Sequence, residues 1–308
     1  MSDDEALKTT LRTAQTGFAA MVESIRPAIH RYCARMTGSV LDGEDLVQET
    51  LAQAFYGLSL LRQEVPLRPW LFKIAHHKCV DFLRGRSMRS TVDLDDGNEP
   101  IAETDMEIED RELASNVFSG LVLALPPKER ASVVLKDVLG YALPEIADIL
   151  ETSIGAVKAA LHRAREKLAG WTETPPPPRQ PPSQVELDYL AAFNRRDWAA
   201  LQAMLAEDVN CQVVGRAHLV GPEALGANYL SNYASLPYGW KLVPGEVDGE
   251  PVIVCLRELE GRWTPRHAIR LEWRGGRVAR IRDYADVPYL FAEGRARIDE
   301  TRRNPNQG

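Results

Sequence analysis

The sequence predicts a multidomain protein, in which an all-α N-terminal part containing a helix-turn-helix is followed by an α+β domain. Apolar residues recur at helical spacing up to about residue 171, whereas alternating apolar and polar residues dominate after about residue 205. A proline-rich stretch from Thr174 to Pro182 separates the two patterns and fits neither a helix interior nor a central strand. At 308 residues the chain is long enough for several domains, each with its own core.

The basic residues gather in two segments of a chain that is acidic overall. The formal net charge is −7, which argues against a protein that coats nucleic acid without selectivity. Seven basic residues nevertheless lie between Arg62 and Arg89, and four lie between Thr152 and Gly170. The two segments predict two separate contacts with the phosphates of DNA.

The cysteines and the apolar runs indicate the compartment. The four cysteines are scattered, with no pair at C-x-x-C spacing, so we expect reduced thiols, no metal site and no cofactor. The first ten residues are polar and acidic, unlike a signal peptide, and no run approaches the roughly 18 apolar residues of a membrane span. The sequence therefore predicts a cytoplasmic protein that does not bind membranes.

Two amphipathic helices are predicted early in the chain. The apolar face of the first consists of Val47, Leu51, Ala54, Phe55 and Leu58. The polar residues off that face are Asp45, Gln48, Glu49 and Gln53. The second helix is expected to start at Pro69, a favourable first-turn residue. Its buried face is expected to contain Leu71, Ile74, Ala75 and Phe82.

The segment from Gly140 to Leu168 predicts a helix-turn-helix. The first helix has an apolar face formed by Leu143, Ile146, Ala147 and Leu150. Glu151–Ser153 interrupts the pattern, and Ser153 is suited to cap the next helix. The second apolar face consists of Ile154, Val157, Leu161, Ala164 and Leu168. This arrangement is typical of DNA-binding proteins, whose second helix enters the major groove, and the alternative is an ordinary helical hairpin with a solvated basic face.

Three motifs, in this order, resemble the sigma-70 family of bacterial transcription initiation factors, extracytoplasmic-function (ECF) type. Asp45–Thr50 resembles region 2.2, and Trp70–Arg84 resembles regions 2.3 and 2.4. Leu125–Arg130 and Val157–Arg165 resemble region 4, and together the motifs cover about Phe18–Ala169.

The resemblance implies a division of the chain. Region 2 would occupy residues 15–88 and region 4 residues 110–171. Between them, residues 89–109 form an acidic linker without helical periodicity. Residues 172–184 form the proline-rich linker, a semi-rigid spacer.

The resemblance also implies two partners, core RNA polymerase and promoter DNA. The region 2.2 helix would bind the clamp helices of the polymerase beta-prime subunit, and region 4 the beta flap. The implied polymerase-binding residues are Asp45, Gln48 and Glu49.

Two sets of residues are expected to bind promoter DNA. Regions 2.3 and 2.4 would open the duplex and bind the minus-ten element through Arg68, Trp70, Lys73, His77, Lys78, Arg84 and Arg86. Trp70 is either the aromatic that stacks on a base or a core anchor. The recognition helix would bind the minus-thirty-five element through Ser153, Lys158, His162, Arg163 and Arg165. Related recognition helices often carry Ser and Arg where this chain has Ala159 and Ala160, so fewer side chains are available to read bases.

After the proline-rich linker, the sequence predicts helices followed by an antiparallel sheet. One or two amphipathic helices span Val185–Leu205. The expected strands are Cys211–Val214, Val252–Leu256, His267–Trp273 and Val278–Tyr284. The expected hairpin turns are Asp248-Gly249, Glu260-Gly261 and Gly275-Gly276.

Residues 185–295 resemble the cone-shaped SnoaL-like α+β domains that are shared with polyketide cyclases and ketosteroid isomerases. The resemblance rests on Phe193–Trp198, Leu205–Val209, Val220–Pro222 and Gly276–Tyr284. It implies a domain that regulates the factor by intramolecular contact with the sigma domains. Residues 296–308 are expected to form a disordered tail.

SnoaL-like folds usually enclose a pocket, and His267 and Asp283 are the candidates to line it. Strand alternation places His267 on the same face as Ile269, and Asp283 on the same face as Ile281. Such a pair suits acid–base chemistry or a small-molecule ligand; otherwise the two are strand-end polar residues with hydrogen-bond partners. We expect no catalytic residue, because fold analogy does not supply catalysis.

The predicted function is therefore promoter-specific transcription initiation with an in-chain regulatory domain. The alternative is a helix-turn-helix regulator fused to a SnoaL-like enzyme or ligand-sensing domain.

Overall fold

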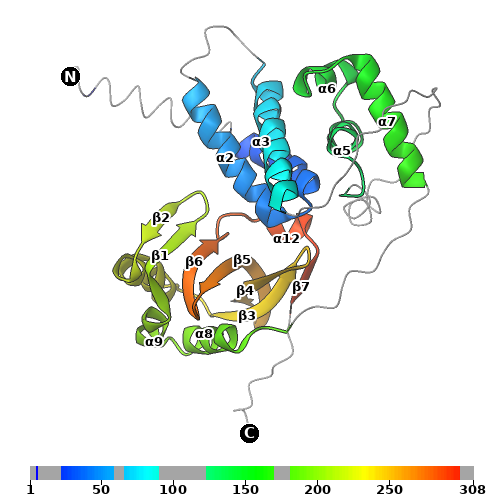
Figure 1. Ribbon diagram of the computed structural model, residues 1–308. Helices are drawn as coiled ribbons and strands as arrows, with labels where there is room; N and C mark the ends of the chain where they lie inside the picture. The colour runs from blue at the N-terminus through cyan, green and yellow to red at the C-terminus, as the bar shows by residue number, and fades with distance from the viewer. Residues whose placement is uncertain (1–4, 6–21, 59–65, 90–122, 170–180, 299–308) are drawn as a thin grey trace. The chain divides into compact units, whose positions relative to one another are not determined.

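The computed structural model describes residues 5, 22–58, 66–89, 123–169 and 181–298 (Figure 1). The chain forms two compact units, Met1–Thr174 and Pro175–Gly308. The linkers predicted at residues 89–109 and 172–184 lie largely outside the described residues.

All described elements of the N-terminal unit are helices. In chain order they are residues 22–37, α2 (Val40–Leu58), α3 (Leu67–Arg89), α5 (Pro127–Val133), the π-helical segment η1 (Val134–Val138), α6 (Leu143–Ile149) and α7 (Ile154–Ala169). The turn between residues 22–37 and α2 passes through Gly38, whose φ of 83° is a conformation that favours glycine. The helix predicted from Pro69 begins two residues earlier, at Leu67.

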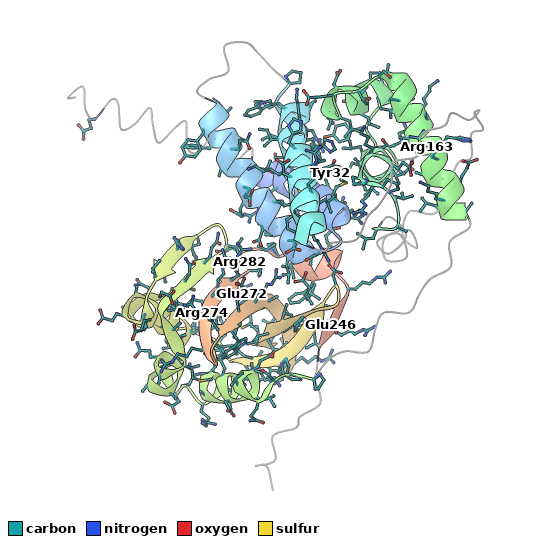
Figure 2. The ribbon with its side chains drawn as sticks, in the orientation of Figure 1. Tyr32, Arg163, Glu246, Glu272, Arg274 and Arg282 are labelled. Carbon is teal, nitrogen blue, oxygen red and sulfur yellow. The ribbon has the colours of Figure 1, made fainter. Side chains whose placement is uncertain are left out.

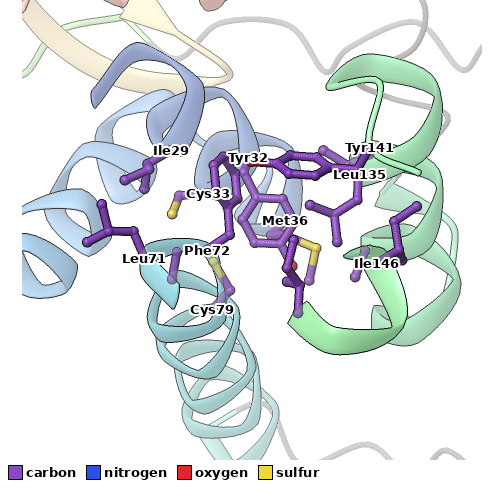
Figure 3. Close-up of a cluster of buried hydrophobic side chains, with 14 of the residues drawn as sticks. Ile29, Tyr32, Cys33, Met36, Leu71, Phe72, Cys79, Leu135, Tyr141 and Ile146 are labelled. Atoms are coloured by element: carbon purple, nitrogen blue, oxygen red, sulfur yellow. The ribbon is translucent and has the colours of Figure 1, made fainter. Parts of the chain in front are cut away.

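One hydrophobic core runs through the described part of the N-terminal unit (Figure 3). Phe72 of α3 lies edge to face against Tyr32 on one side and Tyr141 on the other, with ring centroids 5.8 and 5.2 Å away. Leu135 and Ile146 extend the same cluster. Because aromatic side chains bury large apolar areas, this cluster joins the region 2 segment to the region 4 segment.

A buried arginine adds polar contacts to this core. Arg130 of α5 donates hydrogen bonds to the carbonyl oxygens of Met36, Leu123 and Leu125. Burial lowers the pKa of its guanidinium group. Since a buried charge is costly unless it is hydrogen-bonded, these carbonyl groups keep Arg130 in place and tie α5 to the end of the first helix.

Two residues predicted to be buried are exposed: Phe55 retains 49% and Ile154 43% of its accessible surface. The burial of α2 ends at Ala54, and that of α7 begins at Val157. Helical spacing predicts which residues share a face. It does not predict how much of the length of that face is covered by the elements packed against the helix. Phe55 and Ile154 each lie just outside the part of their helix that is buried by other elements.

The C-terminal unit is built on a seven-stranded sheet with the order β2-β1-β6-β5-β4-β3-β7. The strands are β1 (Leu205–Val213), β2 (Ala217–Val220), β3 (Trp240–Val247), β4 (Glu250–Leu259), β5 (Arg262–Arg274), β6 (Arg277–Asp283) and β7 (Ala296–Ile298). The helical elements are α8 (Gln184–Asn194), α9 (Trp198–Ala203), α10 (Pro222–Ala224), the π-helical η2 (Leu225–Leu230), α11 (Ser231–Ala234) and α12 (Leu290–Glu293).

The strand pairing corrects the expected antiparallel meander in one place. β1 and β6 are parallel, with Cys211 opposite Ile281, whereas the other neighbouring strands are antiparallel. In the chain β2 to β5 lie between these two strands, so no single local turn signal sets the direction of the pair. β2, β3 and β7 were not predicted, and β7 lies within the expected tail.

The three predicted hairpin turns are confirmed. Asp248 and Gly249 have φ values of 52° and 83°, and Glu260 and Gly261 have 51° and 75°. Gly275 and Gly276 also have positive φ. Two successive residues with positive φ are typical of the tight turns that match the twist of antiparallel strands.

Helices and sheet share the core of the C-terminal unit. Phe193 of α8 lies 5.1 Å from Tyr233 of α11 and 5.5 Å from Trp240 of β3, measured between ring centroids. Leu201 of α9 and Ile281 of β6 belong to the same cluster. This core holds η2 and α11 against the strands that carry His267 and Asp283.

Candidate nucleic-acid interface

The basic residues of α3 do not form one continuous stripe. Lys73, His77 and Arg84 follow one another at intervals of four and seven residues, so they share one face of the helix. Arg68 lies in the first turn, and Arg86 is exposed near the other end. Lys78 lies on another side, where its Nζ is 3.4 Å from Oε2 of Glu49 on α2.

Trp70 is half-buried at the start of α3 and packs against the hydrophobic core. Its ring lies against α2, because a Cβ added at Gly57 would be 3.1 Å from the ring. Of the two roles considered for Trp70, this placement favours the core anchor and leaves less of the ring for a base.

Three of the residues predicted to bind minus-ten DNA contact the region 4 segment. Lys73 Nζ lies 2.7 Å from Oε1 of Glu151, and His77 Nε2 lies 2.8 Å from its Oε2. The hydrogen bonds from Lys73 and His77 lower the pKa of the Glu151 carboxyl. Arg68 Nε donates to the Tyr141 hydroxyl over 3.2 Å. These pairs link α3 to the chain that leads into and out of α6.

The helix-turn-helix is confirmed as α6, the turn at Glu151–Ser153, and α7. The Ser153 hydroxyl accepts a hydrogen bond from the backbone N–H of Ala156 over 3.1 Å, so the predicted N-cap is present. Glu151 has a φ of 52°, the left-handed conformation of a tight helix ending. The buried side of α7 consists of Val157, Ala160, Leu161 and Ala164.

A buried carboxylate holds the C-terminal half of α7. Glu129 of α5 accepts hydrogen bonds from Arg163 Nε and Lys167 Nζ, both over 2.9 Å (Figure 2 labels Arg163). Because Glu129 is almost fully buried, it depends on these two cations for compensation. Sequence reasoning missed Glu129, although it lies within the Leu125–Arg130 motif.

Arg165 is also engaged within region 4. Its Nη2 lies 3.3 Å from Oδ1 of Asp137 in η1. Burial raises the pKa of Asp137, and the neighbouring Arg165 opposes that shift. Of the residues predicted to bind minus-thirty-five DNA, Lys158 is exposed, and half-buried His162 has its Nε2 3.5 Å from Glu166 Oε1.

The predicted polymerase-binding residues surround a buried carboxylate on α2. Glu49 is exposed, and Asp45 and Gln48 are half-buried. Gln48 Nε2 donates over 2.8 Å to Oε1 of fully buried Glu44, which also pairs with Arg26. Glu44 was missed, although its spacing from Val47, Leu51 and Ala54 places it on the apolar face.

His267 and Asp283 come together, as strand alternation suggested. His267 Nε2 lies 3.2 Å from Asp283 Oδ1, and both side chains are buried. The Tyr229 and Tyr233 hydroxyls each donate to Asp283 Oδ2, over 2.9 and 2.8 Å. Since the Tyr233 proton is directed to Asp283, His267 Nε2, 2.8 Å away, acts as donor to the Tyr233 oxygen.

Burial controls protonation in this cluster. It lowers the pKa of His267, against the opposing effect of Asp283, so the imidazole is neutral near pH 7. It raises the pKa of Tyr229 and Tyr233, with a further contribution from Asp283. Both tyrosines were missed, because their four-residue spacing is the only signal the sequence offers.

Two further kinds of feature are absent from the described residues. They contain no group of three or more histidine, cysteine, aspartate or glutamate side chains placed to hold a metal ion. No described helix combines the length and apolar character that a membrane crossing requires.

Comparison with known proteins decides the family. The chain matches Sigma-70 region 2 over residues 21–89 and Sigma-70, region 4 over residues 117–168. Over 138 residues it is 33% identical to the ECF RNA polymerase sigma factor SigF of Caulobacter vibrioides, covering 45% of this chain and 75% of that protein. The chain belongs to the ECF sigma factors.

Two further proteins resemble this ECF sigma factor. Over 209 residues it is 32% identical to ECF RNA polymerase sigma factor SigG of Mycobacterium tuberculosis, covering 58% of this chain and 56% of SigG. It thus spans little more than half the length of that relative. The crystal structure of the M. tuberculosis ECF sigma factor SigJ matches over 86% of this chain and 95% of SigJ, with 21% identity and a TM-score of 0.35. The predicted family and fold class are confirmed.

Proposed function

We propose that this sigma factor binds core RNA polymerase and directs it to specific promoters, in the cytoplasm, where both partners are found. The observation that carries the proposal is the helix-turn-helix of α6 and α7 in the same chain as the basic face of α3. A regulator that binds only an operator needs no region 2, so the second basic helix favours a sigma factor over the alternative.

Region 2 is proposed to bind both polymerase and the minus-ten element. On α2, exposed Glu49 and half-buried Asp45 and Gln48 are proposed to contact the beta-prime clamp helices. The face of α3 with Lys73, His77 and Arg84 is proposed to hold phosphates of the opened strand, with Arg68, Lys78 and Arg86 beside it. Trp70 would support this face from the core.

Region 4 is proposed to bind the beta flap and the minus-thirty-five element. Lys158 and His162 lie four residues apart on α7, and neither is held by the buried Glu129. Ser153 would fix the start of the helix. Arg163 and Arg165 would act mainly by holding α7 on α5 and η1, a role that sequence reasoning did not assign to them.

The compact N-terminal unit is proposed to be a resting form. The two promoter elements are about 25 base pairs apart, or about 85 Å at about 3.4 Å per base pair. Lys73 of region 2 and Glu151 of region 4 are 2.7 Å apart, so this arrangement cannot place both regions on their elements. Polymerase would therefore bind an open form in which the two regions have separated.

The C-terminal unit is proposed to regulate this opening by binding, without catalysis. A short proline-rich linker would keep it at a millimolar effective concentration near the sigma regions, so that a weak intramolecular contact suffices. Within the unit, Asp283, Tyr229, Tyr233 and His267 form one hydrogen-bonded network. In it, His267 Nδ1 and Asp283 Oδ1 have no hydrogen-bond partner in the described part of the chain. Such a network suits a structural core or a ligand site as well as acid–base chemistry, and the sigma homology favours regulation.

Run-off transcription with purified core polymerase tests the proposal. The full chain should initiate at specific promoters, and replacing Asp45, Gln48 and Glu49 together with Ala should weaken core binding by about 2–5 kcal/mol. In the control variant, Asp188, Gln202 and Glu223 are replaced with Ala. These are exposed helical residues of the C-terminal unit, two acids and one amide like the set on α2. No initiation above core polymerase alone would refute the function. Equal affinity of the two triple variants for core would refute the assigned surface.

A further inference from the structure

Ile154 is an exposed isoleucine on the recognition helix. It is the first residue of α7 and retains 43% of its accessible surface. Its neighbours Gly155 and Ala156 are small and exposed. A Cβ added at Gly155 would have the Ser153 hydroxyl 3.9 Å away as its nearest contact, so the helix surface at Gly155 is open. Because α5 and α6 leave it exposed, this side chain can contact a partner outside the unit.

The face that carries Ile154 is the one left open for DNA. Ile154, Lys158 and His162 follow at intervals of four residues, so they lie in one row along α7. The larger cations Arg163 and Arg165 are held by carboxylates of α5 and η1. The N-terminal end of this row therefore presents an apolar group followed by a single exposed lysine.

Groove chemistry identifies what Ile154 would contact. In a helix-turn-helix, the N-terminal residues of the second helix meet base edges in the major groove. The apolar feature of that groove is the C5-methyl group of thymine, and apolar side chains read it. We infer that Ile154 is a specificity-determining residue that selects thymine in the minus-thirty-five element by contact with its methyl group. This inference rests on the proposed function and assigns one base preference to it.

Uracil substitution isolates the proposed contact, since uracil differs from thymine only by that methyl group. Holoenzyme formed from the full chain is bound to promoter templates in which each thymine of the minus-thirty-five element, on either strand, is replaced singly by uracil. One replacement should weaken binding about fourfold, the value expected for one buried methyl group. With Ile154→Ala, binding to the thymine template should fall severalfold, and the same replacement should cause no further loss.

Two further variants sharpen the result. Lys158→Ala should weaken both templates equally and keep the uracil effect, because a phosphate contact carries no base information. Ile154→Arg should move the preference at that position towards guanine, which arginine binds through O6 and N7. Ile154 is exposed, so these variants keep the core of α7, and their helicity by circular dichroism should equal that of the original chain.

The outcomes separate this inference from the proposed function. If the original holoenzyme does not depend on a minus-thirty-five element at all, the proposed function of region 4 fails, and the inference fails with it. If it depends on that element but has no uracil-sensitive position, or if Ile154→Ala keeps the full uracil effect, the inference alone is overturned.

Discussion

At the scale of single residues, several buried ionisable groups in the described parts of both units are paired. Glu129 compensates two cations of α7, and Glu44 compensates Arg26. Asp283 accepts two tyrosine hydroxyls. Since removing one partner of such a pair leaves an uncompensated polar group in the interior, these positions are sensitive to substitution.

His267 gives the C-terminal unit a pH dependence with a definite sign. Burial lowers its pKa in the folded state, whereas the unfolded chain takes up a proton near the ordinary value of 6.5. The stability that neutral His267 contributes is therefore complete above about pH 6.5 and is lost as the pH falls below it. His267→Gln, which keeps a donor for Tyr233, should flatten the fall in unfolding free energy between pH 7 and pH 5.

Urea unfolding at a series of pH values measures this effect. Below about pH 6.5 the difference in slope between the original chain and His267→Gln should be at most about 1.4 kcal/mol per pH unit. The matched control is His218→Gln, the same substitution at an exposed histidine of β2. Parallel curves for the original chain and His267→Gln would mean that His267 titrates alike in both states.

At the scale of elements, α3 contacts the turn of the helix-turn-helix. Lys73 and His77 of α3 both pair with Glu151 of the turn, and we call this the α3–turn contact. The contact is solvent-exposed, so salt should weaken it. It also uses cations that are proposed to hold DNA. Occupation of α3 by single-stranded DNA and occupation by the turn therefore exclude each other.

Reversing the charge of Glu151 tests this competition. Glu151→Lys replaces a negative charge with a positive one beside Lys73 and His77, so the α3–turn contact should break and a minus-ten oligonucleotide should bind more tightly at low salt. Fluorescence anisotropy measures the affinity. The control is Glu166→Lys, which makes the same change of net charge at an exposed position of α7. An equal gain in both variants would attribute the effect to net charge and remove the role of the contact.

Sequence reasoning succeeded for elements whose signal is local. The Ser153 cap, the limits of α6 and α7, and the three hairpin turns each follow from a few neighbouring residues. It failed where the structure of an element depends on contacts with residues far away in the sequence. The parallel pairing of β1 with β6 and the exposure of Ile154 depend on what packs against each element, and periodicity does not contain that information.

For the candidate site, the sequence located the helices but not the partners of their side chains. Lys158 is exposed on α7 and His162 lies near Glu166 of the same helix, whereas Arg163 and Arg165 are engaged by Glu129 and Asp137 of other elements. A helical wheel places all four basic positions on one exposed side. Only the packing of α5 and η1 against α7 distinguishes the arginines that carboxylates of those elements hold from Lys158 and His162.

At the scale of the whole molecule, the two units are covalently joined, and the proposed regulation depends on that tether. Truncation after Trp171 should change run-off transcription at a cognate promoter severalfold. The reason is that the truncation removes a partner whose effective concentration is in the millimolar range. Adding the C-terminal unit as a separate chain at micromolar concentration should restore little of the difference. Identical transcription from the full and truncated chains across several promoters would contradict the regulatory role.

The parallel pairing of β1 with β6 has a consequence for the order in which the protein is made. β1 cannot complete its place in the sheet until β6, which ends at Asp283, has been synthesised. About 110 residues separate Thr174, the end of the N-terminal unit, from Asp283. At about 5–20 residues per second, a ribosome needs about 5–22 s to add them. During that interval the N-terminal unit can fold while the C-terminal unit is still incomplete. Under the proposed regulation, each newly made molecule would then pass through a brief unregulated period.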